Sequence, residues 1–457
     1  MKILICGAGQ VGYGIAEQLS AQKNDITVID SSSDLIENVN KSLDVRTIQG
    51  NGSYPHVLDA AGASEADIII AVTQADEVNM VICQVAHTLF SIPTKIARIR
   101  SNYFLNTEYD NLFTRDNIPI DVIISPEKEV GDSILKNLTL PGAFEIIELA
   151  DKRISLLGVN IEDNCSVVDI SLSELTNTYP DINCTVVGIN RNNEIIIPHH
   201  DDKLNHGDKI YLVCDSEHVE QVLSILGHTE SEAHNIIIAG AGNVGSYLSN
   251  LLESKPNINI KLIELNKEIA EKAATTLSKT IVLNGNILDK NILEQAGVGR
   301  ADAYVALTNN ENINLISSVI AKEMGAKQTL SLLMDNNYND LQSRLGIDTF
   351  VNPRDDTISS ILRYLRKGRI RDAHSLYNGL VEVVEAEVID ASPLIGKYLK
   401  EAEIPDGLRI GAILRAGEVV RPDGNTKIEL NDRVVIFSLT ETIHAIEQLF
   451  RASHDYY

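Results

Sequence analysis

Short runs of apolar residues alternate along the chain with longer stretches in which apolar residues recur at helical spacing. Strands that alternate with helices are typical of a parallel sheet with helices on both faces. The start of the chain is therefore predicted to form a Rossmann-like, doubly wound parallel sheet. Its strands are expected at residues 2–6, 26–29, 45–48, 67–72, 95–99 and 121–124.

The same pattern returns in the second half of the chain. The glycine run at 7–12 recurs at 240–245, and the apolar run at 26–30 recurs at 260–264. The offset is 233 to 235 residues through the predicted sheet, falls to 227 just after it, and is 224 near the end of each half. Such self-similarity indicates two copies of one structural unit.

Each predicted sheet is followed by a different kind of segment. A proline opens an amphipathic stretch in both copies, as expected in the first turn of a helix. Short β-rich runs and a closing helix then predict a small α+β domain. We expect an α/β fold with sheet domains at 1–125 and 234–352, linking helices at 126–142 and 353–373, and small domains at 143–227 and 374–453. The polar, acidic stretch 227–234 is the expected linker between the halves.

Both sheets begin with a G-x-G-x-x-G turn between a strand and a helix. Glycine there lets the chain turn tightly and lets the helix amides approach a pyrophosphate. An acid ends the next strand in both copies, Asp30 and Glu264. Its carboxylate can accept hydrogen bonds from ribose hydroxyls and would repel a 2′-phosphate, so NAD(H), ATP or ADP is expected rather than NADP.

Further candidates lie where the strands end. Arg98 is placed to meet a ligand phosphate or to stack on an adenine, while Leu333 aligns with it in the second copy, which therefore lacks this cation. Asn and Thr are also common where strands end and turns begin. A purely structural role in a turn is therefore the alternative to ligand contact for the Asn and Thr residues named next. The predicted nucleotide-binding residues are Gly7, Ala8, Gly9, Gln10, Val11, Gly12, Asp30, Asn51, Thr73, Gln74 and Arg98, with Gly240, Ala241, Gly242, Asn243, Val244, Glu264, Asn286 and Thr308 in the second copy.

Composition narrows the possible functions. The chain has 457 residues with 39 Lys and Arg against 64 Asp and Glu, a formal charge of −25. Phosphate backbones would repel it, so nucleic-acid binding is disfavoured. Its apolar runs are far shorter than the roughly 20 residues of a membrane-spanning helix. With no signal peptide and no C-x-x-C pair, we expect a cytoplasmic protein.

These features together resemble the TrkA proteins, peripheral regulatory subunits of Trk potassium-uptake systems that contain two RCK (regulator of potassium conductance) units. The resemblance rests on both glycine runs, Asp30, Gly50-Asn51, Thr73 and residues 96–100. It implies NAD(H) or adenine-nucleotide binding in the sheet domains and a homo-oligomeric ring of RCK units. We expect a homotetramer, docked on the inner face of the cell membrane beneath a potassium-translocating subunit of the TrkH or TrkG type.

Two other functions are weighed against this one. An NAD-dependent oxidoreductase would couple one dinucleotide domain to a distinct catalytic domain, but here the remainder is a second copy of the first. A metal site could use His199, His200, Asp201, Asp202 and His206. However, the second copy has Asp423-Gly424-Asn425 at this place. We therefore expect no enzyme activity and no metal, but a nucleotide-sensing subunit that gates potassium uptake.

Overall fold

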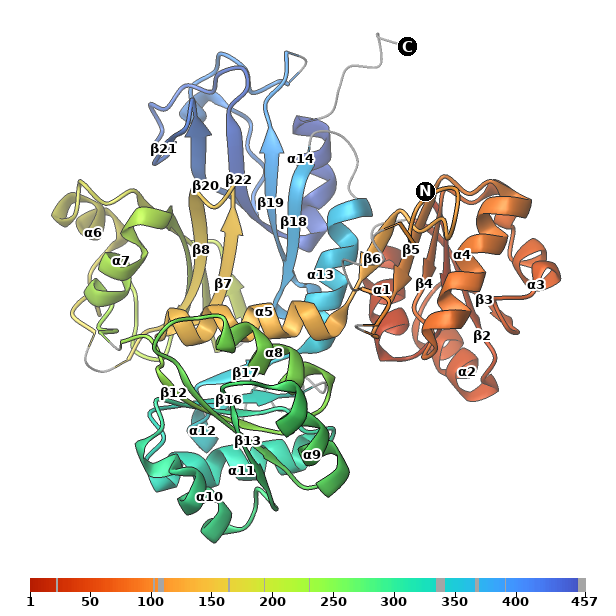
Figure 1. The fold of residues 1–457 in the computed structure, drawn as a ribbon. Helices are drawn as coiled ribbons and strands as arrows, with labels where there is room; N and C mark the ends of the chain where they lie inside the picture. The colour runs from red at the N-terminus through yellow and green to blue at the C-terminus, as the bar shows by residue number, and fades with distance from the viewer. Residues whose placement is uncertain are drawn as a thin grey trace. The chain divides into compact units, whose positions relative to one another are not determined.

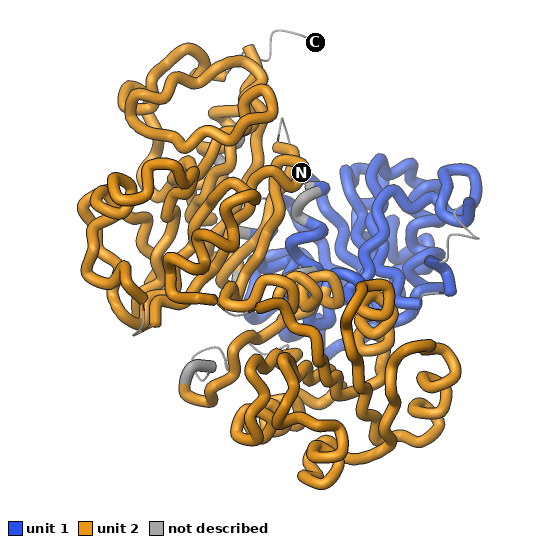
Figure 2. Tube along the Cα trace, turned by 60° about the vertical axis from the view of Figure 1, so that its left-hand side comes forward, with its two compact units in different colours: residues 1–129, 354–365 blue, residues 130–353, 366–457 orange. Residues whose placement is uncertain are grey.

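The computed structural model describes residues 1–21, 24–101, 103–105, 111–162, 165–192, 194–229, 231–333, 342–365, 370–390 and 392–450. The chain divides into two compact units, shown in Figure 2: residues 1–129 with 354–365, and residues 130–353 with 366–457. The first unit holds one sheet domain. The second holds the other sheet domain and both small domains.

The first sheet domain contains six parallel strands in the order β3-β2-β1-β4-β5-β6 (Figure 1). Apolar side chains cover both faces of the central strands, so Ile3 and Ile5 join one core while Leu4 joins the other. The strands are β1 (Lys2–Cys6), β2 (Asp25–Asp30), β3 (Arg46–Gln49), β4 (Ile68–Ala71), β5 (Thr94–Arg98) and β6 (Val122–Ile124). The helices are α1 (Gln10–Ala21), α2 (Ser33–Ser42), α3 (Pro55–Ala60) and α4 (Asp76–Phe90).

The second sheet domain repeats this topology in the order β14-β13-β12-β15-β16-β17. Its strands are β12 (Asn235–Ala239), β13 (Asn259–Glu264), β14 (Ile281–Asn284), β15 (Ala303–Ala306), β16 (Gln328–Leu332) and β17 (Thr349–Val351). Its helices are α8 (Asn243–Glu253), α9 (Lys267–Thr276), α10 (Lys290–Ala296), α11 (Glu311–Met324) and α12 (Gln342–Leu345). The strand order reverses at β1 and β4 and again at β12 and β15, the place where such sheets bind ligands.

Both small domains contain a five-stranded antiparallel sheet, in the orders β10-β9-β11-β8-β7 and β18-β19-β22-β20-β21. The first has β7 (Ala143–Leu149), β8 (Ile154–Asn160), β9 (Cys184–Arg191), β10 (Glu194–Ile196), β11 (Lys209–Asp215), α6 (Leu172–Thr178) and α7 (Val219–Ile225). The second has β18 (Ile370–Leu376), β19 (Val381–Glu387), β20 (Leu408–Arg415), β21 (Glu418–Val420), β22 (Arg433–Leu439) and α14 (Ile443–Leu449). The predicted fold class is confirmed.

The two small domains pack sheet against sheet through two similar contacts. A Cβ atom at Gly188 would lie 2.5 Å from the Phe437 ring, and one at Gly411 would lie 2.7 Å from Val213. Val213 and Phe437 occupy the same position in the two repeats. The sheets therefore approach closely where a glycine faces a larger side chain, in both directions.

Each linking helix packs on the sheet domain of the other half. Helix α13 (Pro353–Leu365) places Ile358 and Ile361 in the core of the first sheet domain. Helix α5 (Pro126–Thr139) places Val130, Ile134 and Leu138 in the core of the second. The halves of the chain thus exchange helices. None of the described helices is long and apolar enough to cross a membrane.

Side-chain size matches each linking helix to its sheet domain. On α1, a Cβ atom at Gly14 would lie 2.7 Å from Ile358 of α13. On α8 the aligned residue is Tyr247, and its ring faces Gly131 of α5. In both contacts a glycine faces a large side chain. The glycine is on the sheet-domain helix in the first contact and on the linking helix in the second. The reverse pairing would oppose two glycines in one place and two large side chains in the other.

This packing predicts the effect of a side chain at position 131. A valine there would overlap the Tyr247 ring, and overpacking of this kind costs about 1–3 kcal/mol of folding free energy. Gly131→Val should therefore lower the thermal unfolding midpoint measured by scanning calorimetry. Lys128→Val, on an exposed position of the same helix, is the matched control. Equal midpoints for the two variants would contradict the tight contact.

Candidate functional site

The first glycine run lies at the carboxyl edge of its sheet, between β1 and α1. Gly7 has a left-handed φ of 113°, and a Cβ atom there would lie 2.8 Å from the Val72 carbonyl oxygen. A Cβ atom at Gly12 would overlap the carbonyl of Gly7. At Gly9, by contrast, no other atom lies within 4 Å of the Cβ position. The fold explains two of the glycines, whereas Gly9 leaves open space beside the first amides of α1.

The second glycine run has the same geometry. Gly240 has a φ of 109° and approaches the Leu307 carbonyl, and a Cβ atom at Gly245 would overlap the carbonyl of Gly240. No atom lies within 4 Å of the Cβ position at Gly242. Both loops therefore present an open surface at the start of a helix, where backbone amides favour an anion.

The two predicted acids are held against these loops. Asp30 accepts hydrogen bonds from the backbone amides of Ala8 (2.7 Å) and Ser32 (2.8 Å). Glu264 accepts them from the amides of Ala241 and Asn266, both at 2.8 Å. A carboxylate has about four acceptor positions, so each retains capacity for ribose hydroxyls. The structure thus places each acid beside its glycine run, as the spacing predicted.

A buried asparagine bridges neighbouring strand ends in each sheet domain. The Asn79 side-chain oxygen accepts from the Thr73 amide (2.9 Å) and hydroxyl (2.7 Å), and its Nδ2 donates to the carbonyls of Thr73 and Arg98. Asn314 makes the same bonds to Thr308 and to the Leu332 carbonyl. Neither asparagine was among the predicted site residues, although both are identical between the repeats.

The remaining predicted side chains have local roles. Asn51 Oδ1 accepts from the Ser53 amide at 3.0 Å, and Asn286 Oδ1 accepts from the Leu288 amide at 2.9 Å. These are turn interactions, the structural alternative for these residues. Gln74 is exposed beside Thr73. Ligand contact by these residues stays a prediction.

Arg98 lies between the ends of β4 and β5. Its Nη2 donates to the Thr73 carbonyl at 2.8 Å, and burial lowers the pKa of the guanidinium, which still remains charged at neutral pH. The neighbouring Arg100 pairs with Glu127 at 2.9 Å. A cation therefore lies at the crevice of the first sheet domain.

The position equivalent to Arg98 needs a correction by one residue. Ala97 pairs with Ala71 and Ser331 with the equivalent Ala306, so Arg98 corresponds to Leu332 and not to Leu333. The asparagine bridges agree, because they end on the carbonyls of Arg98 and Leu332. Strand pairing sets this register, which the sequence offset alone misjudged. Leu332 is apolar too, so the second site still lacks this cation.

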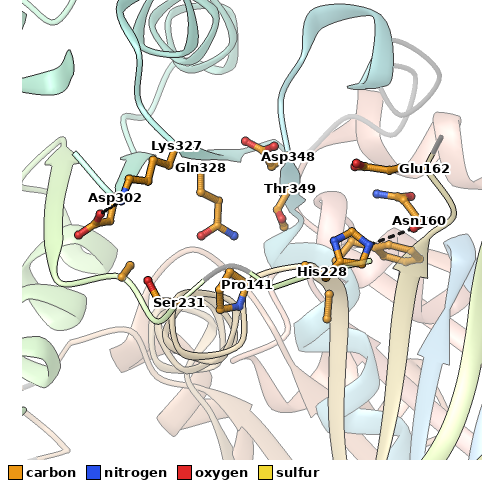
Figure 3. A pocket seen from close by; sticks show the side chains of 14 residues that line it. Pro141, Asn160, Glu162, His228, Ser231, Asp302, Lys327, Gln328, Asp348 and Thr349 are labelled. Atoms are coloured by element: carbon orange, nitrogen blue, oxygen red, sulfur yellow. Dashed lines mark hydrogen bonds and ion pairs between the residues drawn. The ribbon is translucent and has the colours of Figure 1, made fainter. Parts of the chain in front are cut away.

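A separate cavity of about 320 Å³ lies in the second unit, at the amino ends of β16 and β17 (Figure 3). Three carboxylates line it, Glu162, Asp302 and Asp348. Two of them are paired with a lysine: Asp302 with Lys327 at 2.8 Å and Asp348 with Lys322 at 2.7 Å. This is the opposite edge of the sheet from the second glycine run. Within the described part of the chain, no three His, Cys, Asp or Glu side chains are grouped to hold a metal ion.

A glycine-loop sheet domain followed by a small α+β domain, present twice, defines a tandem RCK-type chain. The TrkA-N domain family matches residues 3–126 and 236–353, and the TrkA-C domain family matches residues 156–227 and 383–451. The "Trk system potassium uptake protein TrkA" of Azorhizobium caulinodans is 45% identical over 458 residues, which cover 100% of both chains. The chain belongs to the TrkA family. Because this relative is a potassium uptake protein, the prediction of no enzyme activity is confirmed.

Two solved structures share the fold. "GsuK channel bound to NAD" matches with a TM-score of 0.60 and 16% identity, covering 98% of this chain and 78% of that one. "Crystal structure of the GsuK bound to ADP" matches with a TM-score of 0.50 and 14% identity, covering 80% and 69%. At these identities the likeness concerns the fold alone.

The asparagine bridges carry a testable consequence for stability. Asn79→Ala would remove the acceptor of the Thr73 amide and the side-chain donor to the Arg98 carbonyl, while the Thr73 carbonyl keeps its bond from Arg98. Each buried group left unsatisfied costs about 1–3 kcal/mol. Chemical denaturation should show a lower midpoint, with a similar decrease for Asn314→Ala. Asn79→Asp keeps the acceptor but turns a buried carboxylate oxygen toward the carbonyls of Thr73 and Arg98, so its midpoint should also fall below that of the wild type. Wild-type midpoints for both alanine variants would show that the bridges do not stabilise the strand ends.

Proposed function

We propose that this chain is the nucleotide-sensing regulatory subunit of a Trk-type potassium-uptake system, and that the first sheet domain binds NAD(H), ATP or ADP. The observation that carries the proposal is the open surface at Gly9 with the Asp30 carboxylate fixed beside it. Family membership supports the transport role. The GsuK channel, which shares the fold and was solved bound to NAD, supports the ligand class.

The residues of the first site have complementary parts in this proposal. The amides at the start of α1 receive the pyrophosphate, and Asp30 accepts hydrogen bonds from the adenosine ribose hydroxyls. Arg98 neutralises phosphate charge through charge-assisted hydrogen bonds. The second site has Glu264 but Leu332 in place of Arg98, so it binds phosphate-bearing ligands more weakly and serves mainly as structure.

Regulation follows from differential affinity. A nucleotide shifts a channel between two states only by as much as it prefers one of them, commonly about 1–3 kcal/mol. We expect four copies of the chain to form a ring of eight RCK units. In this proposal the ring docks at the inner face of the membrane on an integral potassium-translocating subunit of the TrkH or TrkG type. Nucleotide binding changes the ring, and the ring changes the pore.

The ligand assignment predicts unequal effects of removing the two acids. Asp30→Ala should weaken binding of NADH or ADP by about 1–3 kcal/mol, the scale for a lost charged hydrogen-bond partner. Glu264→Ala should change the tighter binding event little. Calorimetric titration of both variants measures this. Unchanged titration by Asp30→Ala would place the ligand elsewhere, and steady hydride transfer by the wild type would contradict the regulatory role.

The switch assignment predicts a separable defect in Arg98. In vesicles that contain the membrane subunit, Arg98→Ala should abolish nucleotide control of potassium flux, because phosphate charge at the crevice is no longer neutralised. Light scattering should show the wild-type oligomer, so that the defect is not one of assembly. Stronger loss of control in Glu264→Ala than in Arg98→Ala would move the switch to the second half.

A further inference from the structure

The start of helix α13 brings an arginine from the second half of the chain onto helix α1 of the first sheet domain. Arg354 Nη2 lies 2.8 Å from Glu17 Oε2. Its guanidinium also covers Gly14, where a Cβ atom would lie 2.5 Å from Nε and 3.0 Å from Nη2. The arginine therefore lies flat against one side of α1.

The glycine at position 14 of α1 leaves the space that the Arg354 side chain occupies. Glycine in the middle of a helix is unfavourable relative to alanine, because it loses more backbone freedom on folding. Nothing in the backbone of α1 requires it, since Gly14 is not among the residues with positive φ. The nearest atoms to its Cβ position belong to Arg354 and Ile358. The missing side chain makes room for them.

The same side of α1 leads to the glycine run. Gln10, Gly14 and Glu17 are spaced by four and three residues, so they lie on one face of the helix. Gln10 is the first residue of α1 and follows the open position at Gly9. One helical turn rises about 5.4 Å. The Arg354 guanidinium, which lies beside Gly14, is therefore about one helical turn from the start of α1.

We propose that Arg354 leaves Glu17 and binds a phosphate of the nucleotide in the first glycine run. The Glu17 side chain is 48% exposed and that of Arg354 is 24% exposed, so water screens the acid partner of this ion pair and weakens its attraction for the guanidinium. A guanidinium matches phosphate geometry with two parallel hydrogen bonds, which are stronger. Phosphate therefore competes successfully with Glu17. This inference rests on the proposed nucleotide site and adds a contact from the opposite half of the chain.

The contact has a direct consequence for regulation. Arg354 is in the first turn of α13, which precedes the second small domain in the chain. A phosphate held by both α1 and Arg354 ties this helix to the ligand. The residue aligned with Arg354 in the first half is Glu127, an acid. The second sheet domain thus receives no equivalent cation from its linking helix.

Calorimetry on the full chain with two probes, ADP and adenosine, tests the inference. Arg354→Gln should raise the Kd for ADP about tenfold, the scale of one charge-assisted bond to phosphate. The Kd for adenosine, which has no phosphate, should stay within about twofold because its contacts are unaltered. A purely structural role of Arg354 would weaken both probes alike, and that outcome would overturn the inference.

Glu17→Gln provides an independent arm, also if Arg354→Gln does not fold. Removing the competing acid should lower the Kd for ADP about threefold, as for a weak ion pair, with adenosine unchanged. In the double variant this gain should disappear. An unchanged ADP Kd in Glu17→Gln refutes the exchange of partners. If the wild type binds neither probe, the proposed nucleotide site itself is refuted. If the wild type binds ADP and Arg354→Gln binds it with the same Kd, only the arginine contact is refuted.

Discussion

Each sheet domain depends on one contact for a complete core: the packing of the linking helix from the other half of the chain. Ile358 enters the core beneath α1, and Tyr247 covers Gly131 of α5, so each sheet domain is completed by a segment more than a hundred residues away in the chain. Such long-range contacts are costly to form but make the two halves interdependent. Each glycine run therefore belongs to a sheet domain whose core includes a helix of the opposite half.

The two sheet domains show how one scaffold can hold sites of different character. Both keep the positive-φ glycine, the acid that accepts two backbone amides, and the asparagine bridge between strand ends. These features shape the loop and the crevice. The two cations that would neutralise phosphate, Arg98 and Arg354, lie at the first sheet domain. The residues aligned with them, Leu332 and Glu127, are not cationic. The two sheet domains thus share the scaffold and differ in charge.

Each small domain contains a buried ion pair between an arginine and an aspartate. Arg191 forms two parallel hydrogen bonds with Asp208, at 2.8 and 2.7 Å, and Arg415 forms the same pair with Asp432. Both aspartates are 1% exposed. A buried carboxylate is tolerated only with such complete pairing. The same pair therefore holds the end of an antiparallel sheet in each small domain.

The sequence by itself determined the features that depend on local chemistry. Apolar runs predicted the strands, and the repeat offset identified two copies. The glycine spacing and the acids Asp30 and Glu264 located the loops, because strand, turn and helix lie next to one another in the chain. Their function as ligand contacts remains predicted.

Tertiary structure decided what depends on residues distant in sequence. The asparagine bridge joins Asn79 to the Arg98 carbonyl at the end of a neighbouring strand. Strand pairing also showed that Leu332 is the residue equivalent to Arg98 in the second sheet domain. The exchange of α5 and α13, and with it the place of Arg354 on α1, has no local signature at all. Helical spacing says that one face of a helix is buried, but only complementary side-chain volume selects the surface that buries it.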